Sequence, residues 1–148
     1  MKTLLRLLCT PLLLALVGAQ APEPDGQAVR FEAVDVFVDS GERPLAAYQF
    51  ELTAEVGDVK IVGIEGGQHA AFQHPPYYDE AAMHRDRVII AAFNTGKHLP
   101  TGRTRVARLH VQVTGPQQPD YAIRLDVAAT SDGGKIPATI SAAKGEAR

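Results

Sequence analysis

The sequence predicts an all-β fold, an antiparallel β-sandwich of about seven to nine strands with at most one short helical turn. Apolar and polar residues alternate along most of the chain after residue 28, which places successive side chains on opposite faces of a sheet. Turns rich in glycine and proline separate the alternating segments. No segment keeps a helical period over the roughly ten residues that a typical helix needs.

The first two predicted strands show this alternation clearly. In 29–39, Val34, Val36 and Val38 share one face and Phe37 takes the other. In 46–54, polar residues separate an apolar set that predicts a half-buried strand, made of Ala46, Tyr48, Phe50, Leu52 and Ala54.

The next two predicted strands, 59–64 and 88–93, are short apolar runs rich in β-branched residues. Such runs are typical of strands that are buried on both faces, so we expect these two to be covered on both sides. Between them, Asp79 is a suitable N-cap for one helical turn over 79–84.

The last three predicted strands are 105–114, 121–129 and 136–140. Their apolar sets are Ala107, Leu109, Val111 and Val113; Tyr121, Ile123, Leu125, Val127 and Ala129; and Ile136, Ala138 and Ile140. Pro137 places the last strand at the edge of a sheet, because proline has no N–H to donate to a ladder.

Residues 1–19 have the pattern of a secretory signal peptide. Lys2 and Arg6 precede an apolar run, and small residues precede a cut after Ala19, with a cut after Ala21 as the alternative. The apolar run is about half the length of a membrane span. The protein is therefore predicted to be exported, to the periplasm or the extracellular space, with no membrane span in the mature chain.

The rest of the chain divides into a flexible leader at 20–28, one sandwich domain at 29–143 and a C-terminal tail at 144–148. Cys9 is the only cysteine and leaves with the signal peptide, unless it serves as a lipid anchor. The mature chain then has neither a disulfide nor a thiolate metal site. Its charge is mildly acidic, which gives no electrostatic footprint for nucleic acid.

The order of segments resembles that of the cohesin domain, within the wider group of carbohydrate-binding-like sandwiches. The segments that carry the resemblance are the strand 31–39, LAAYQFEL at 45–52, VKIVGI at 59–64, the strand 87–94, the loop 99–102 and VARLHV at 106–111. The resemblance implies a jelly-roll sandwich over roughly the whole of 29–143. It also implies that the protein binds a protein partner, dockerin-like or other, since the best-known cohesins bind dockerin modules through one sheet face.

The segment 65–87 is the predicted functional region, because it is much longer than the usual connection of about 4 to 6 residues. It combines aromatic rings, histidines and prolines. We expect a binding surface formed by Phe72, His74, Tyr77, Tyr78 and Asp79. The alternative is that the aromatic rings fold the segment back onto the sheet as a lid.

Two sets of side chains are weak candidates for metal binding. Neutral imidazoles suit zinc or copper, and the candidates are His69, His74 and His84, with Asp79 beside them. Carboxylates suit calcium, and the candidates at a strand end are Asp35, Asp39 and Glu42. Neither set has the spacing of a compact ligand motif, so no metal and no cofactor is predicted.

The sequence has no nucleophile elbow, phosphate loop or dinucleotide fingerprint, so it is not predicted to be an enzyme. Asp79 and Glu80 are adjacent acids, but adjacency in sequence does not define a glycosidase pair. Arg103, Arg105 and Arg108 give one strand a basic character, which we expect to prevent pairing with another chain or to meet an acidic partner.

These observations predict an exported, non-catalytic module that binds a protein partner. A carbohydrate-binding module is the first alternative, with Phe72, Tyr77 and Tyr78 stacking on sugar rings. The absence of tryptophan disfavours that alternative. A periplasmic metal-binding protein that uses the histidines is the second alternative.

Overall fold

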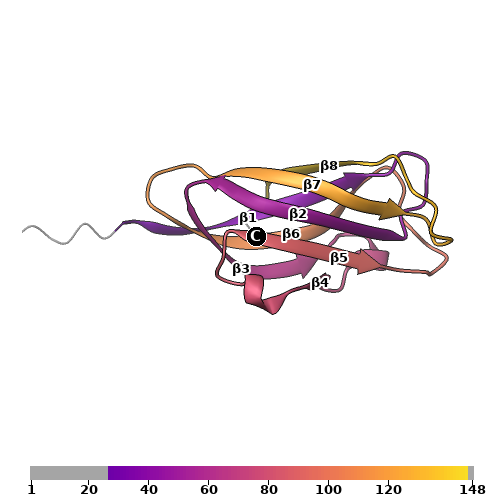
Figure 1. Ribbon diagram of the computed structural model, residues 1–148, viewed down its shortest axis with the longest axis horizontal. Coiled ribbons are helices and arrows are strands. Elements are labelled where there is room, and N and C mark those ends of the chain that lie inside the picture. Colours follow the sequence, from indigo (N-terminus) through magenta and orange to yellow (C-terminus); the bar gives the residue numbers. More distant parts are fainter. Residues whose placement is uncertain (1–26, 147–148) are drawn as a thin grey trace, which may run out of the picture.

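The structure is a computed structural model that describes residues 27–146, which form a sandwich of two four-stranded sheets (Figure 1). The predicted signal peptide, Cys9, most of the leader and the end of the tail lie outside the described residues. The strand order is β3-β6-β1-β8 in one sheet, called sheet A, and β4-β5-β2-β7 in the other, called sheet B. Within 27–146, no helix is both long and apolar enough to cross a membrane.

All strand pairs are antiparallel. Sheet A contains β1 (Val29–Asp39), β3 (Asp58–Gly66), β6 (Arg103–Thr114) and β8 (Thr139–Lys144). Sheet B contains β2 (Ala47–Val56), β4 (Tyr77–Tyr78), β5 (Arg87–Phe93) and β7 (Asp120–Ala129). Two short 3-10 helices, η1 (Ala70–Phe72) and η2 (Glu80–Ala82), lie between β3 and β5. The predicted antiparallel β-sandwich is therefore confirmed.

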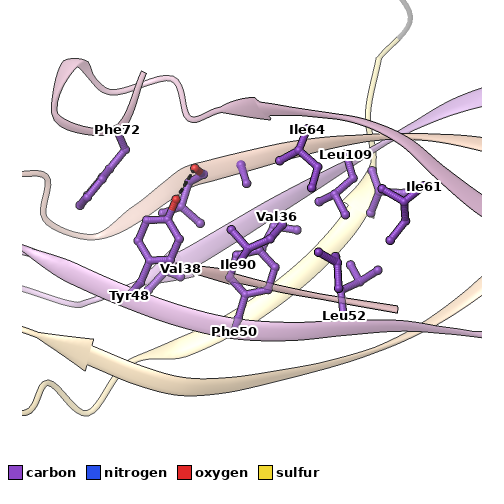
Figure 2. Packing of buried hydrophobic residues seen from close by; sticks show 14 of the residues in the cluster. Val36, Val38, Tyr48, Phe50, Leu52, Ile61, Ile64, Phe72, Ile90 and Leu109 are labelled. Carbon is purple, nitrogen blue, oxygen red and sulfur yellow. Dashed lines mark hydrogen bonds between the residues drawn. The ribbon is translucent and has the colours of Figure 1, made fainter. Parts of the chain in front are cut away.

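The hydrophobic core lies between the two sheets (Figure 2). The predicted inward sets of the first strands are confirmed, since Val36, Val38, Phe50 and Leu52 are completely buried. Each such side chain contributes about 1.5 to 3 kcal/mol through removal of apolar surface from water. The Tyr48 side chain extends across the core from sheet B, and its hydroxyl donates a 2.9 Å hydrogen bond to the backbone oxygen of Val106 in sheet A (Figure 2).

The expectation that 59–64 and 88–93 are buried on both faces is wrong. In β5, Val88 and Ile90 point inward, whereas Ile89 is 42% exposed and Phe93 is 66% exposed. The reason is that each strand of a two-layer sandwich has only one inner face. In β3, the exposed Lys60 likewise lies between buried neighbours. The apolar run of β5 therefore contributes to an apolar outer surface as well as to the core.

β-Bulges change the faces of β7 and β6. Gln49 and Phe50 are consecutive in β2, and they lie opposite Val127 and Leu125 of β7. Asp126, between these two β7 residues, is therefore the extra residue. The alternation predicted through Val127 is therefore wrong beyond that point, because Val127 is 42% exposed and Ala128 is buried. A bulge reverses which parity of residues faces the core.

In β6, the extra residue is Val106. The consecutive β1 residues Val36 and Phe37 lie opposite Ala107 and Arg105, which leaves Val106 unpaired. Both Val106 and Ala107 are fully buried. Arg105 and Arg108 are three positions apart and would face opposite sides of a regular strand. The extra residue brings both onto the outer face of sheet A.

The helical turns and the last strand complete the comparison with the sequence. The predicted turn is present as η2, where the Asp79 carboxylate accepts a 2.9 Å hydrogen bond from the Ala81 N–H. The second turn, η1, was not expected. β8 lies at the edge of sheet A, as Pro137 predicts, but it runs from Thr139 to Lys144 and so begins later than expected.

Candidate binding surface

The segment between β3 and β5 folds back onto the sandwich around Phe72. The Phe72 ring is 3% exposed and meets the Tyr48 ring edge-on at a centroid distance of 5.1 Å. Its backbone oxygen accepts a 2.6 Å hydrogen bond from the Gly67 N–H. The Asn94 amide adds a 2.9 Å bond to the Ala71 oxygen. Phe72 therefore closes one end of the core, which matches the lid alternative.

The other predicted binding residues lie on different surfaces. Tyr77 and Tyr78 are consecutive in β4, so their side chains take opposite faces. Tyr77 is 68% exposed, whereas Tyr78 packs partly buried against the core. His74 and Asp79 are exposed, and the Asp79 carboxylate is used in the N-cap of η2. Phe72, Tyr77 and Tyr78 thus do not form one platform of three rings.

An exposed apolar surface does form on the outer face of sheet B. We call it the aromatic face and define it by Tyr77 on β4, Ile89 and Phe93 on β5, and Val127 on β7. Tyr77 lies opposite Ala91, which makes Phe93 its diagonal neighbour. The two rings are nearly parallel, with an interplanar angle of 10° and a centroid distance of 6.1 Å.

A small residue lies directly opposite each of the two rings, Ala91 opposite Tyr77 and Ala47 opposite Phe93. Ala47 lies directly opposite Phe93 on one side and opposite Ala129 on the other. These methyl side chains leave the rings as the most prominent groups at this end of sheet B. A contacting molecule can therefore reach the ring of Phe93 without displacing a larger neighbour.

Charged side chains border the aromatic face farther along β2. Glu51 accepts hydrogen bonds from Arg87 at 2.8 and 3.1 Å and from Arg124 at 3.2 Å. Arg124 also donates to Asp126 at 2.8 Å. The bonds from Arg87 lower the pKa of Glu51, so the cluster stays ionised at neutral pH. The positive and negative charges balance, and the aromatic face carries no strong charge of its own.

The exposure of Phe93 and Ile89 was not predicted from the sequence, because their strand was expected to be buried on both faces. A usable signal was present one residue before the predicted strand. Arg87 has the same parity as Ile89 and Phe93, and a charged residue marks the side that faces water. Its exposure in β5 identifies these apolar neighbours as surface residues.

The candidate metal ligands are not brought together. The His69 Nδ1 accepts a 3.1 Å hydrogen bond from the Ala71 N–H and caps η1, and His74 and His84 are exposed. Of the calcium candidates, Asp35 binds arginines and Asp39 accepts from the Gly41 N–H. Within residues 27–146, no group of three or more histidine, cysteine or acidic side chains is placed to hold a metal ion.

The outer face of sheet A contains a second polar feature, the ion triad of Asp35, Arg105 and Arg108. Asp35 lies opposite Arg108 and accepts bonds of 2.6 and 2.8 Å from it, with a third of 3.2 Å from Arg105. All three residues are buried. The bonds from Arg108 lower the pKa of Asp35 below its ordinary value, despite the opposing effect of burial. Asp35 offsets only one of the two positive charges of Arg105 and Arg108, and the Arg103 guanidinium lies 3.6 Å from the centre of the Phe37 ring. The expectation that these arginines protect an exposed strand is wrong, because β6 pairs with both β3 and β1.

A hollow of about 580 Å³ adjoins the triad, with Ala33, Arg108 and His110 among its lining residues. The His110 Nε2 and the Glu65 carboxylate are 2.8 Å apart at its border. Cationic and anionic groups alternate around this hollow, so it favours no charge of ligand. The aromatic face is the clearer candidate, because four exposed apolar side chains from three strands lie on it, whereas Phe31 is the one such side chain among the residues that line the hollow.

No protein-family model, no curated protein and no solved structure gives a significant match to this chain. The fold is a β-sandwich with exposed apolar side chains on the outer face of sheet B. Function is therefore inferred from the geometry of the described residues.

Proposed function

We propose that this protein is an exported, non-catalytic binding module, resembling a cohesin, that contacts a protein partner through the aromatic face. The observation that carries the proposal is the exposure of Tyr77 (68%) and Phe93 (66%) as neighbours on one sheet. Aromatic side chains offer large contact areas at little cost in conformational entropy, and they are frequent among the residues that dominate binding energy at protein interfaces.

The shape and composition of the surface favour a protein partner. The members of the aromatic face lie on β4, β5 and β7, and Gln49 of β2 lies between Ala91 and Val127. Aliphatic groups at Ile89 and Val127 widen the apolar area beyond the two rings. The ion cluster around Glu51 supplies a polar border. An apolar centre with a polar rim is the usual anatomy of a protein interface.

Capture of a partner by the immobilised protein from its native exported fraction tests this proposal. We expect Phe93→Ala to weaken partner binding at least tenfold, the effect of losing about 1.4 kcal/mol. The matched control is Phe31→Ala, because Phe31 is 71% exposed on the outer face of sheet A. Equal binding by the parent and Phe93→Ala proteins, or an equal loss in Phe31→Ala, contradicts the proposed surface.

Carbohydrate binding is a second candidate, favoured by the nearly parallel exposed rings of Tyr77 and Phe93. Parallel rings can stack on the flat faces of sugar units. A glycan-array screen distinguishes the two functions. Binding of a glycan that is lost in Tyr77→Ala supports the carbohydrate function, whereas a stoichiometric protein partner with no glycan signal supports the first proposal.

A further inference from the structure

We propose that β8 joins two copies of this chain, by pairing antiparallel with β8 of a second copy across a twofold axis. β8 is an edge strand of sheet A and pairs with β1 alone among the described strands. Its other side therefore presents a row of backbone N–H and C=O groups that no strand of residues 27–146 covers. This inference is independent of the aromatic face, which belongs to the other sheet.

The register shows which groups form the open row. The Gly145 N–H donates a 2.8 Å hydrogen bond to the Ala33 oxygen, in continuation of the ladder between β8 and β1. Bonded and non-bonded pairs alternate along an antiparallel ladder. The odd-numbered residues of β8 therefore bond to β1, and the groups that face the open edge belong to Ile140, Ala142 and Lys144.

β8 has fewer of the features by which edge strands avoid pairing than β7 has. Charges, bulges and prolines within the strand are the usual protections. The neighbouring edge strand β7 has Arg124 and a bulge at Asp126, and the Ile136 N–H covers its end by donating to Ala128 at 2.9 Å. β8 keeps a regular register with β1 throughout. Its only charged residue is Lys144, at its C-terminal end.

The open row is complementary to itself. When Ala142 lies opposite Ala142 of a second copy, Ile140 of each copy lies opposite Lys144 of the other. The free N–H groups of each row then face the free C=O groups of the other row, as in an antiparallel ladder. The two lysines stand at opposite ends of this joint and do not repel each other closely. Each Lys144 also has an anionic partner in its own chain, because its Nζ lies 3.4 Å from the Glu32 carboxylate. Ser141 and Ala143, the exposed side chains between them, are small.

The seam between β8 and β7 favours a second sandwich over a free peptide. These two edge strands contact each other and lie along the same margin of the molecule (Figure 1). Apolar side chains there are only partly buried, namely Tyr121, Ile123, Leu125, Ile140 and Ala142. A single peptide strand would cover the edge of sheet A alone. A second copy also brings its own β7, so the seams of both copies become covered while both aromatic faces stay open.

The oligomeric state of the protein in its natural processed form tests this inference. We expect light scattering after size exclusion to show twice the monomer mass as concentration rises. Ser141→Lys places two lysines diagonally across the joint and should remain a folded monomer at the same concentrations. The matched control, Ala122→Lys, adds the same charge at an exposed position of β7 and should stay dimeric. A parent protein that is monomeric up to about 1 mM overturns the inference.

Amide hydrogen exchange tests the register directly. We expect the Ala142 and Ile140 amides to exchange at least tenfold more slowly at dimer concentrations than in dilute protein. The Ser141 and Ala143 amides, which bond to β1, should be protected at every concentration. A dimer that leaves the Ala142 amide unprotected, or that persists in Ser141→Lys, contradicts pairing through β8. Partner capture by Ser141→Lys then shows separately whether the aromatic face still works.

Discussion

Asp35 holds two buried arginines on the outer face of sheet A. Its carboxylate forms close bonds to both Arg108 and Arg105. The triad has two positive charges and one negative charge. Asp35 is thus the central anion of the group, and its loss leaves two poorly hydrated guanidinium groups without their common partner.

We expect Asp35→Asn to lower the free energy of unfolding at pH 7 by about 3 kcal/mol. The bonds from Arg108 hold the pKa of Asp35 below its ordinary value of 3.8. The resulting stabilisation is fully present above that ordinary pKa and is lost as the pH falls through the lowered pKa of the folded protein. Urea titrations of parent and variant at pH 7 and pH 2.5 measure the difference. Glu55→Gln, at an exposed position, is the control, and a difference that does not shrink in acid contradicts the assignment.

The bulge in β6 shows why part of the structure could not be read from the sequence. The alternation of Ala107, Leu109, Val111 and Val113 was enough to predict an inward face, and all four are buried. Val106 is also apolar, so an extra residue at this position leaves no visible break in the pattern. The joint location of Arg105 and Arg108 depends on that extra residue and therefore escaped prediction.

The aromatic face illustrates the same limit for whole strands. Apolar composition located β5 correctly but predicted burial on both faces, although the parity of Arg87 would have oriented the strand. The position of Phe93 beside Tyr77 depends on the pairing of β4 with β5. Pairing between strands that are separated by a long connection is set by packing of the complete sandwich. Local periodicity contains no information about it.

Tyr48 ties the β6 bulge to sheet B. Its hydroxyl donates to the backbone oxygen of Val106, and burial raises the pKa of the hydroxyl, which keeps it protonated. We expect Tyr48→Phe to lower the free energy of unfolding by about 1 to 2 kcal/mol, because a buried carbonyl loses its donor. Tyr77→Phe removes the same hydroxyl from an exposed ring and is the matched control. Equal urea midpoints for the two variants would falsify this role of Tyr48.

The residue that closes the core and the residues of the proposed binding surface occupy different parts of the sandwich. Phe72 closes the core at one end and contacts Tyr48, whereas Phe93 and Tyr77 stand outside sheet B. If β8 pairs with a second copy, the dimer presents two aromatic faces that remain free. Partner binding and folding should then respond to different substitutions in the same segment of chain.

Phe72→Ala and Tyr77→Ala separate these two properties. We expect Phe72→Ala to lower the free energy of unfolding by about 3 to 5 kcal/mol, because it opens a cavity at the end of the core. Tyr77→Ala should change it by less than about 0.5 kcal/mol, since the ring is mostly in water. Below its unfolding transition, Phe72→Ala should still capture the partner, whereas Tyr77→Ala should not. Thermal unfolding followed by partner capture at a temperature where both variants are folded measures this. Loss of capture in folded Phe72→Ala with retention in Tyr77→Ala would move the recognition surface from the aromatic face to the η1 segment.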